Sequence, residues 1–401
     1  MANYIAGLDI GSQSIKILVV NQVKGGGLEV AFQGQEEAKG VRRGVVISPQ
    51  EVADILQSIV QKAGQDIGRK INAVNINVGG SHIFVSPSRG LISVSRADRK
   101  ISEEDVRRVL QAAQDFSLPP NKEIFDTVPR EFIIDGEKGI KEAVGLEGLR
   151  LEADVLVMGG FTPYLENLNQ AVLGADLDIS NRLSSPVASA LACLSEKQKE
   201  LGVALVDIGA GTTGLAVFEE GDLLHLAILP IGSGHITNDI AIGLKTDIEV
   251  AERIKIDYGT CSSPKSQKRE KIDLDDGEAL VFSQKQLVNI IIPRITQIFG
   301  EVHKELKKIS MEKSLPSGIV LTGGGAKMPG IKELAKKELK LPVRIGCPQG
   351  IANFKDPSWS VCAGLVLNSA DWEKKNGILD SSGILDPVKK TFRKLFKMFL
   401  P

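Results

Sequence analysis

The sequence predicts an α/β protein with two related domains. The stretches "YIAGLDIGSQSIKILVV" from Tyr4 and "GVALVDIGAGTTGLAVF" from Gly202 share one pattern, in which Asp-Ile-Gly and small residues separate two apolar runs. Apolar runs of strand length alternate with amphipathic helical patterns along the rest of the chain. The 401 residues suffice for two or three domains. A long-period repeat of this kind indicates two lobes with a cleft between them.

The composition excludes several classes of function. With 42% apolar and 25% charged residues, the chain is typical of a soluble globular protein. Aromatic residues make up only 4% and the net charge is −1, so we expect no nucleic-acid partner. The four cysteines have no paired spacing, which predicts reduced thiols. We find no signal peptide and no run of 18 apolar residues, and we expect a cytosolic protein.

The first domain is expected in residues 1–80 and 161–200. It begins with the strand–turn–strand unit, a further strand and a helix. Ser48 is placed to cap this helix, with Glu51 completing a capping box, and Gly68 is placed to end it. The apolar run "INAVNINVGG" then predicts a strand.

Residues 81–160 are expected to form an inserted α/β subdomain. A short helix follows Ser102, and Pro119-Pro120 interrupts the chain. Two strand patterns, "TVPREFIIDG" and "LEADVLVMGG", come next and are joined by a glycine-rich loop.

The second domain is expected in residues 201–240 and 300–369, with a second insertion at 241–299. A long helix is predicted from Lys285 to Ile309. The stretch "SGIVLTGGGAKMPG" predicts a buried strand, a glycine turn and another helix. A polar linker is expected at 370–387.

The repeated turns point to phosphate binding. Such a turn presents successive backbone N–H groups to an anion, and Gly11, Gly209 and Gly211 permit close approach. Asp9 and Asp207, at strand ends, suit a Mg²⁺ ion held through its water shell. A single turn of this type is most often a plain hairpin. Two copies, with the late glycine turn, favour a nucleoside triphosphate gripped from both sides. The hydroxyl donors of the two turns are Ser12, Thr212 and Thr213.

These motifs together resemble the actin, sugar-kinase and heat-shock-chaperone ATPase superfamily. Within it, the chain resembles the FtsA family of bacterial cell-division proteins, most specifically at residues 129–155 and 234–259. The resemblance covers residues 4–369. It implies an actin-like two-domain ATPase fold with duplicated ribonuclease-H-like cores, called 1A and 2A. It also implies an FtsA-type 1C subdomain as the first insertion and an upper lobe, 2B, as the second.

The resemblance further implies an ATP and Mg²⁺ site. Glu252 and Lys255 match the ribose and adenine ligands, although this spacing also fits a solvated ion-pair face of a helix. Ser185 stands where many hydrolytic relatives carry Glu or Gln, so we expect ATP binding with slow or negligible hydrolysis and leave the catalytic residues unknown. The positions that match the family's nucleotide site are Asp9, Gly11, Ser12, Gln13, Lys16, Asp207, Gly209, Gly211, Thr212, Thr213, Gly232, Glu252, Lys255, Gly324, Gly325 and Met328.

Residues 388–401 form a basic amphipathic segment. It is too short to cross a bilayer as a helix but suits the surface of an anionic membrane. Docking on its own domain and binding of nucleic acid are the alternatives. The apolar stripe, at helical spacing, is Phe392, Leu395, Phe396 and Phe399. The basic residues are Lys389, Lys390, Arg393, Lys394 and Lys397.

The family resemblance implies a scaffold that polymerises on the inner membrane at the division site and tethers FtsZ filaments there. It implies contact with the acidic FtsZ tail, other division proteins and itself. Arg294 is a candidate for the FtsZ contact, and a plain helix-surface residue is the alternative. A pilus-assembly ATP-binding protein and a small-molecule kinase of the same superfamily are competing interpretations.

Overall fold

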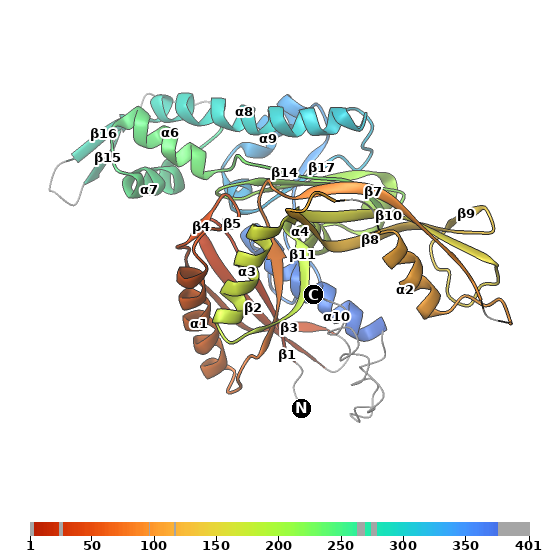
Figure 1. Ribbon diagram of the computed structural model, residues 1–401. Helices are drawn as coiled ribbons and strands as arrows, with labels where there is room; N and C mark the ends of the chain where they lie inside the picture. Colours follow the sequence, from red (N-terminus) through yellow and green to blue (C-terminus); the bar gives the residue numbers. More distant parts are fainter. Residues whose placement is uncertain are drawn as a thin grey trace.

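Two sheets with the same strand order form the two domains of the computed structural model, which describes residues 4–375 except 24–26, 96, 116–117, 263–268 and 274–278 (Figure 1). Each sheet has three antiparallel strands followed by two parallel ones. The predicted α/β fold with a duplicated unit is therefore confirmed. The first sheet has the order β11-β6-β1-β2-β3, with β1 (Tyr4–Ile10), β2 (Ser14–Gln22), β3 (Leu28–Glu37), β6 (Ala73–Val78) and β11 (Asp178–Ser184). The second has the order β14-β13-β12-β17-β18, with β12 (Val203–Ile208), β13 (Thr213–Glu219), β14 (Asp222–Leu229), β17 (Ile319–Thr322) and β18 (Val343–Ile345).

A third sheet forms the first insertion and extends away from the two domains in Figure 1. Its order is β7-β10-β8-β9, with β7 (Phe84–Ser93), β8 (Lys122–Ile134), β9 (Glu137–Ile140) and β10 (Arg150–Phe161). Helix α2 (Glu103–Ala112) packs against β7 and β10. Ser102 caps α2 in a complete capping box with Asp105.

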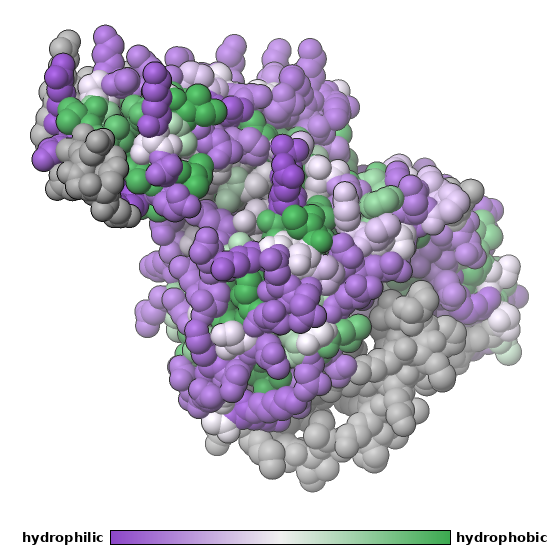
Figure 2. Space-filling view, turned by 60° about the vertical axis from the view of Figure 1, so that its left-hand side comes forward, coloured by the Kyte–Doolittle hydropathy of each residue, from purple (hydrophilic) through white to green (hydrophobic). Residues whose placement is uncertain are grey.

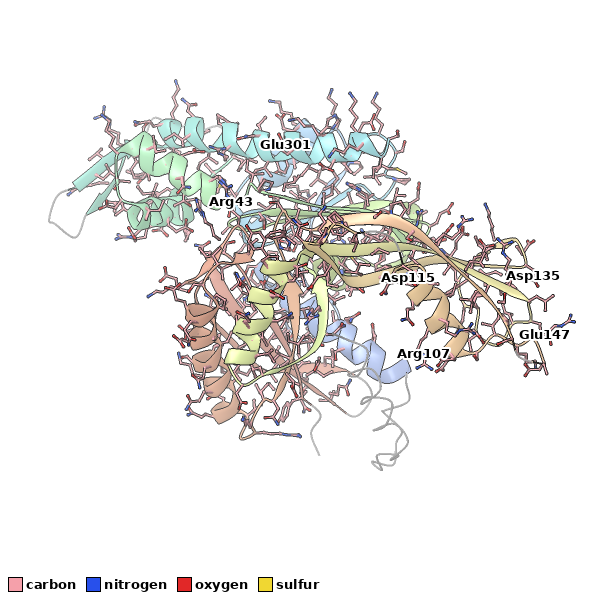
Figure 3. All side chains as sticks on the ribbon, viewed as in Figure 1. Arg43, Arg107, Asp115, Asp135, Glu147 and Glu301 are labelled. Atoms are coloured by element: carbon pink, nitrogen blue, oxygen red, sulfur yellow. The ribbon has the colours of Figure 1, made fainter. Side chains whose placement is uncertain are left out.

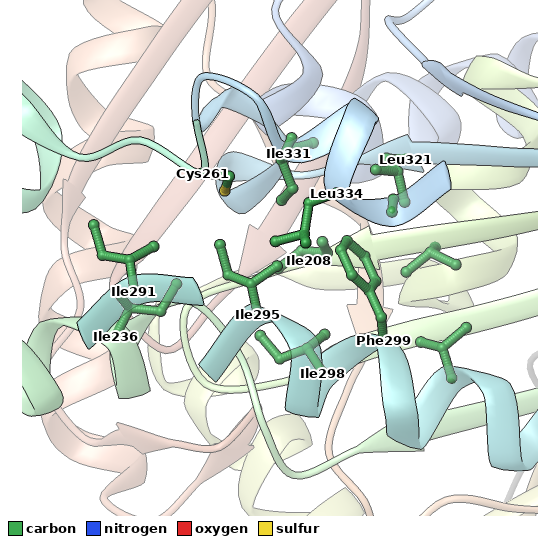
Figure 4. Close-up of a cluster of buried hydrophobic side chains, with 14 of the residues drawn as sticks. Ile208, Ile236, Cys261, Ile291, Ile295, Ile298, Phe299, Leu321, Ile331 and Leu334 are labelled. Atoms are coloured by element: carbon green, nitrogen blue, oxygen red, sulfur yellow. The ribbon is translucent and has the colours of Figure 1, made fainter. Parts of the chain in front are cut away.

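The second insertion is a helical lobe that projects from the second domain. It contains α6 (Gly234–Leu244), α7 (Ile248–Tyr258), the hairpin of β15 (Arg269–Asp273) and β16 (Ala279–Ser283), and the start of α8 (Gln284–Lys308). Helix α8 runs back over the second sheet toward α9 (Ile331–Leu339), and their apolar faces form one core with that sheet. Figure 4 shows Ile295, Ile298 and Phe299 of α8 facing Ile208 and Leu334 in this core.

A second core lies between the two domains. Helices α1 (Pro49–Asp66) and α3 (Thr162–Gly174) cover one face of the first sheet. Helices α4 (Ser185–Cys193) and α10 (Ser360–Lys375) pack together in a cluster that draws residues from both sheets. The short helix α5 (Glu196–Leu201) leads into β12.

Three details differ from the expectations. Ser48 is the N-cap of α1 but makes no side-chain capping bond, so the capping box with Glu51 is absent and Pro49 alone marks the start. Helix α10 continues to Lys375, so residues 370–375 are helical rather than linker. It also packs on β1 and α4, which places the end of the expected 300–369 segment with the first sheet. The remaining domain boundaries stay predictions.

Among the described residues, no helix combines the length and the apolar character needed to span a membrane. The predicted amphipathic segment at 388–401 lies outside these residues, as does most of the expected linker.

The contact between α4 and α10 requires a glycine at position 364. A Cβ built there would lie 1.7 Å from the carbonyl oxygen of Ala188, a backbone atom that no rotamer change can move. We expect Gly364→Ala to lower the free energy of unfolding by about 3 kcal/mol or more. Gly300→Ala in α8 is the control, because a Cβ there meets nothing within 4 Å and alanine favours the helix. Equal effects of the two variants in chemical denaturation contradict this packing.

Candidate functional site

The two repeated turns have the same backbone geometry. In the first, the Gly11 N–H donates to the Ser14 carbonyl at 3.2 Å, and in the second the Gly209 N–H donates to the Thr212 carbonyl at 2.9 Å. These bonds close both turns at the same distance from the preceding aspartate. Residues 11–13, between β1 and β2, form the first loop, and residues 209–212, between β12 and β13, form the second loop.

Both loops offer free backbone donors. In the described part of the chain, the N–H groups of Ser12 and Gln13 make no hydrogen bond, and neither do those of Ala210 and Gly211. Hydrogen bonds fix two carbonyls of the second loop. The N–H groups of Ser233 and Gly234 donate to the Gly209 and Ala210 carbonyl oxygens, respectively, at 2.8 Å. Paired N–H groups with no protein acceptor form a site suited to anions.

Gly232 lets the start of α6 approach the second loop. A Cβ on Gly232 would lie 2.5 Å from the Gly209 carbonyl oxygen and 2.6 Å from that of Ala210. The two loops also touch each other, since a Cβ on Gly211 would lie 2.5 Å from Ser12 Oγ. Any larger residue at either glycine therefore displaces the loops.

Asp9 is held in place by Asn77 on the neighbouring strand β6. Asn77 Nδ2 donates to Asp9 Oδ1 at 2.9 Å, and Asn77 Oδ1 accepts the Ile10 N–H at 2.8 Å. Burial of the carboxylate raises the pKa of Asp9, and the positive charge of Lys16 partly offsets this rise. Asn77 is not among the residues identified from the sequence. The signal that could have pointed to it is a pair of asparagines, Asn75 and Asn77, at alternate positions of a buried strand.

Asp207 is buried at the end of β12. Ser189 of α4 donates its hydroxyl to Asp207 Oδ2 at 2.5 Å. Burial raises the pKa of Asp207 to about 6; the Ser189 bond opposes the rise, Asp9 adds to it, and Lys16 opposes it. The negative charges of the two carboxylates therefore repel each other. Keeping both carboxylates ionised without a nearby cation costs free energy.

Lys16 of β2 lies between the domains. Its Nζ donates to the Ser358 carbonyl at 2.5 Å and sits 5.5 Å from the centre of the Trp359 ring. Both partners belong to the short helix η2 (Pro357–Trp359), whose Pro357 carbonyl also accepts the Gly323 N–H at 3.1 Å. Lys16 therefore links the first sheet to the glycine turn of the second domain.

Glu252 and Lys255 of α7 form an ion pair at 2.6 Å, but not on a solvated face. The Lys255 side chain is buried and also donates to Thr237 at 2.8 Å. Glu252 accepts from Thr237 and, across the cleft, from Gln13 Nε2 at 3.0 Å. Burial alone would raise the pKa of Glu252. The hydrogen bonds from Lys255 and Thr237 outweigh this effect and hold that pKa below its ordinary value.

The glycine turn after β17 has one open side. A Cβ on Gly325 would lie 2.4 Å from Ile208, and one on Gly323 would lie 2.2 Å from an Asp207 carboxylate oxygen. A Cβ on Gly324, in η1 (Gly324–Lys327), would meet nothing within 4 Å. Gly324 thus faces open space, while its neighbours pack on the second sheet. The Met328 sulfur lies 3.3 Å from the Cβ position of Gly259, at the end of α7.

The structure does not present every predicted residue to the cleft. Thr213 is fully buried, and its hydroxyl donates to the Ile231 carbonyl at 2.7 Å. Its hydroxyl proton is therefore bound by the protein, and its role toward a ligand stays a prediction. The roles of the other predicted nucleotide ligands stay predictions.

The Ser185 hydroxyl is already engaged. It donates to the Val78 carbonyl at 3.3 Å and accepts from Asn77 Nδ2 at 3.0 Å. Arg294, the candidate partner contact, is also engaged: its guanidinium makes two bonds to Asp239, at 2.6 and 2.8 Å. No group of three His, Cys, Asp or Glu side chains with metal-binding geometry occurs within the described ranges. Asp9 and Asp207 are therefore not joined there by a third such side chain.

Comparison with known proteins identifies relatives of this chain. The family model "Cell division protein FtsA" matches residues 204–364, and "SHS2 domain inserted in FTSA" matches residues 80–158. The FtsA of Pseudomonas aeruginosa is 35% identical over 370 residues, covering 90% of this chain and 88% of the relative. The FtsA of Borreliella burgdorferi is 33% identical over 406 residues, covering 99% and 98%.

Two solved structures share the fold. A chain of the PilM–PilN type IV pilus biogenesis complex has a TM-score of 0.66 at 18% identity, covering 91% of this chain and 98% of that chain. MreB5 of Spiroplasma citri bound to ADP has a TM-score of 0.57 at 15% identity, covering 94% and 98%. These likenesses confirm the predicted actin-like fold and carry no more than that.

The raised pKa of Asp207 makes the stability of the protein depend on pH. Its pKa of about 6 in the fold lies above the ordinary 3.8. The protonated form therefore stabilises the nucleotide-free protein below about pH 4, and this contribution is lost as the pH rises through 6. We expect Asp207→Asn to raise the free energy of unfolding near neutral pH by up to about 3 kcal/mol, because asparagine carries no charge to bury.

Thermal unfolding between about pH 4.5 and 8 measures this effect. The exposed Asp54 on α1 supplies the control variant, Asp54→Asn, for which we expect little change. An Asp207→Asn protein that is less stable than the parent near neutral pH contradicts the inferred burial cost.

Proposed function

Because the chain belongs to the FtsA family of cell division proteins, we propose that it binds Mg-ATP between its first and second loops. The observation that carries this proposal is the pair of matched turns, each with two free N–H groups and a preceding carboxylate, that contact each other. Two such donor sets fit a chain of phosphates better than a single anion.

The residues present fit a magnesium nucleotide. Bound Mg²⁺ neutralises phosphate charge and would relieve the cost of burying the Asp9 and Asp207 carboxylates. Lys16 adds a positive charge beside the loops. Glu252 and Lys255 supply polar groups for a ribose, and the open side of Gly324 leaves room for a flat base.

We further propose that hydrolysis is slow. A water that attacks phosphate needs a group that accepts its proton or orients it. By the family resemblance, Ser185 stands where many hydrolytic relatives carry Glu or Gln, and its hydroxyl already bonds Val78 and Asn77. ATP then acts mainly as a bound ligand that favours one arrangement of the two domains.

Membrane attachment and polymerisation form the next part of the proposal. The apolar stripe and basic residues of 388–401 support a helix at the inner face of an anionic membrane. One short helix binds weakly, and a filament of ATP-bound subunits would hold many of them at high effective concentration. In this way the protein would tether the FtsZ polymer to the membrane at the division site.

The projecting lobe of α6, α7 and β16 is the proposed partner surface. Figure 2 shows apolar residues gathered there among polar ones, and the exposed large ones are Ile242, Ile248, Ile256 and Val281. Arg294 at the base of this lobe stays a proposed contact for the acidic FtsZ tail. A tail carboxylate would have to replace Asp239, which now binds the guanidinium through two bonds.

The relationships favour this role over the two competing interpretations. The cell-division relatives are 33–35% identical over most of their length, whereas the pilus protein is 18% identical and shares the fold.

Calorimetric titration with Mg-ATP tests the nucleotide site. We expect saturable binding that requires Mg²⁺ and at least a tenfold weaker affinity in Asp9→Asn, since a charged ligand of this type contributes about 1.5–3 kcal/mol. Asp54→Asn is the matched control on the surface of the same domain. Absence of binding in the parent protein refutes the proposed function.

Co-sedimentation with anionic lipid vesicles tests the membrane segment. Replacing Phe392, Phe396 and Phe399 together by serine removes most of the apolar stripe while keeping every basic residue. We expect membrane affinity to fall by at least about tenfold, because burying each phenylalanine stabilises the bound state by about 1.5–3 kcal/mol. Thr391→Ser keeps the stripe and should bind like the parent. Unchanged binding of the triple variant argues against insertion of this segment.

A further inference from the structure

A short hairpin of the first domain has an unexpected residue at its tip. It consists of β4 (Val41–Arg42) and β5 (Val45–Val46), joined by Arg43 and Gly44. Both loop residues have positive φ, 51° for Arg43 and 74° for Gly44. Two-residue hairpin loops of this kind strongly prefer Asn or Asp before the glycine, because those side chains tolerate the left-handed region. Arginine is therefore present against the local backbone preference.

The tip of this hairpin lies where the two loops meet. The Gly44 N–H donates to Ser12 Oγ at 2.7 Å, which fixes the hairpin to the first loop. The Cβ position of Gly211, in the second loop, lies 3.0 Å from the Arg43 Cα. On its other side the tip packs on the end of β6, since a Cβ on Gly44 would lie 2.7 Å from the Gly80 nitrogen. Figure 3 places Arg43 at the top of the first domain, facing the lobe of α6 and α7.

The Arg43 side chain is exposed, and its charge is not compensated by the protein. In the described part of the chain it makes no hydrogen bond or ion pair, and the same holds for the adjacent Arg42. The other cation beside the loops, Lys16, already donates to the Ser358 carbonyl. An unpaired guanidinium on a rigid turn, next to two sets of free N–H groups, offers an anion a further binding partner.

We propose that Arg43 is a phosphate-binding residue of the nucleotide site, contacting the phosphate chain held between the two loops. This inference rests on the proposed binding of Mg-ATP. It explains why a long cationic side chain occupies a turn position that favours asparagine. It also makes the hairpin a third binding segment beside the two repeated loops, although the hairpin itself is not part of the repeat.

The variant Arg43→Asn separates ligand binding from folding. Asparagine suits the turn, so the melting temperature of the nucleotide-free protein should stay equal or rise. The affinity for Mg-ATP, measured by calorimetric titration of the full chain, should fall at least about tenfold, as expected for loss of a charge-assisted hydrogen bond. Arg43→Lys should lose less, because it keeps the charge without the planar fork.

Arg42→Asn is the matched control, because it removes the same charge from the adjacent exposed position. We expect its Mg-ATP affinity to stay within about twofold of the parent, since Arg42 belongs to strand β4 and not to the turn that meets the second loop. Equal losses in the two variants show only a long-range effect of charge and overturn the proposal, as does an Arg43→Asn protein that binds like the parent. If the parent itself binds no Mg-ATP, the proposed function fails instead.

Discussion

Two carboxylates at the contact between the two domains are the constraint around which this protein is organised. Asp9 and Asp207 end equivalent strands of the two sheets, and burial raises the pKa of both. Their supports converge on a single helix. Ser189 of α4 bonds Asp207 directly, and Ser185, one turn earlier, accepts from the Asn77 amide that holds Asp9. Helix α4 therefore fixes both carboxylates at once, and its own position depends on the close contact with α10 at Gly364.

This arrangement ties distant parts of the chain to the cleft. Helix α10 and η2 follow the second domain in sequence, yet α10 packs on β1 and η2 accepts the hydrogen bond from Lys16. The segment that leads toward the C-terminus is thus built on the first sheet and in contact with both domains. A change in the relative position of the two domains must therefore be accommodated at η2 and α10, which precede in sequence the segment proposed to bind membrane.

The sequence predicts the features that depend on a local pattern. It does not predict the side-chain partners and domain contacts that depend on residues distant in the chain. The repeated turns were predictable because Asp-Ile-Gly between two apolar runs is a local signal. Residues 360–369 are expected with the second domain because they follow it in sequence, whereas α10 packs on β1 and α4, which are distant in the chain. Thr213 is expected at the ligand from the turn's hydroxyl pattern and the family resemblance, but its hydroxyl bonds the Ile231 carbonyl, 18 residues away in sequence, which no local pattern reveals. Asn77 and Ser189 act through partners more than 15 residues away in sequence, which no local pattern reveals.

The contacts between the loops also bear on what a bound nucleotide does. The two domains already touch there, through Gly211 beside Ser12 and through the bond from Gln13 to Glu252. The groups that make these contacts are the same ones that face the proposed phosphate and ribose positions. A ligand held by the free N–H groups of both loops would contact both domains, and its affinity would depend on the distance between the domains. In the proposed function, binding alone would select a domain arrangement without rapid hydrolysis, and the proposed filament would then be controlled by occupancy of the nucleotide site.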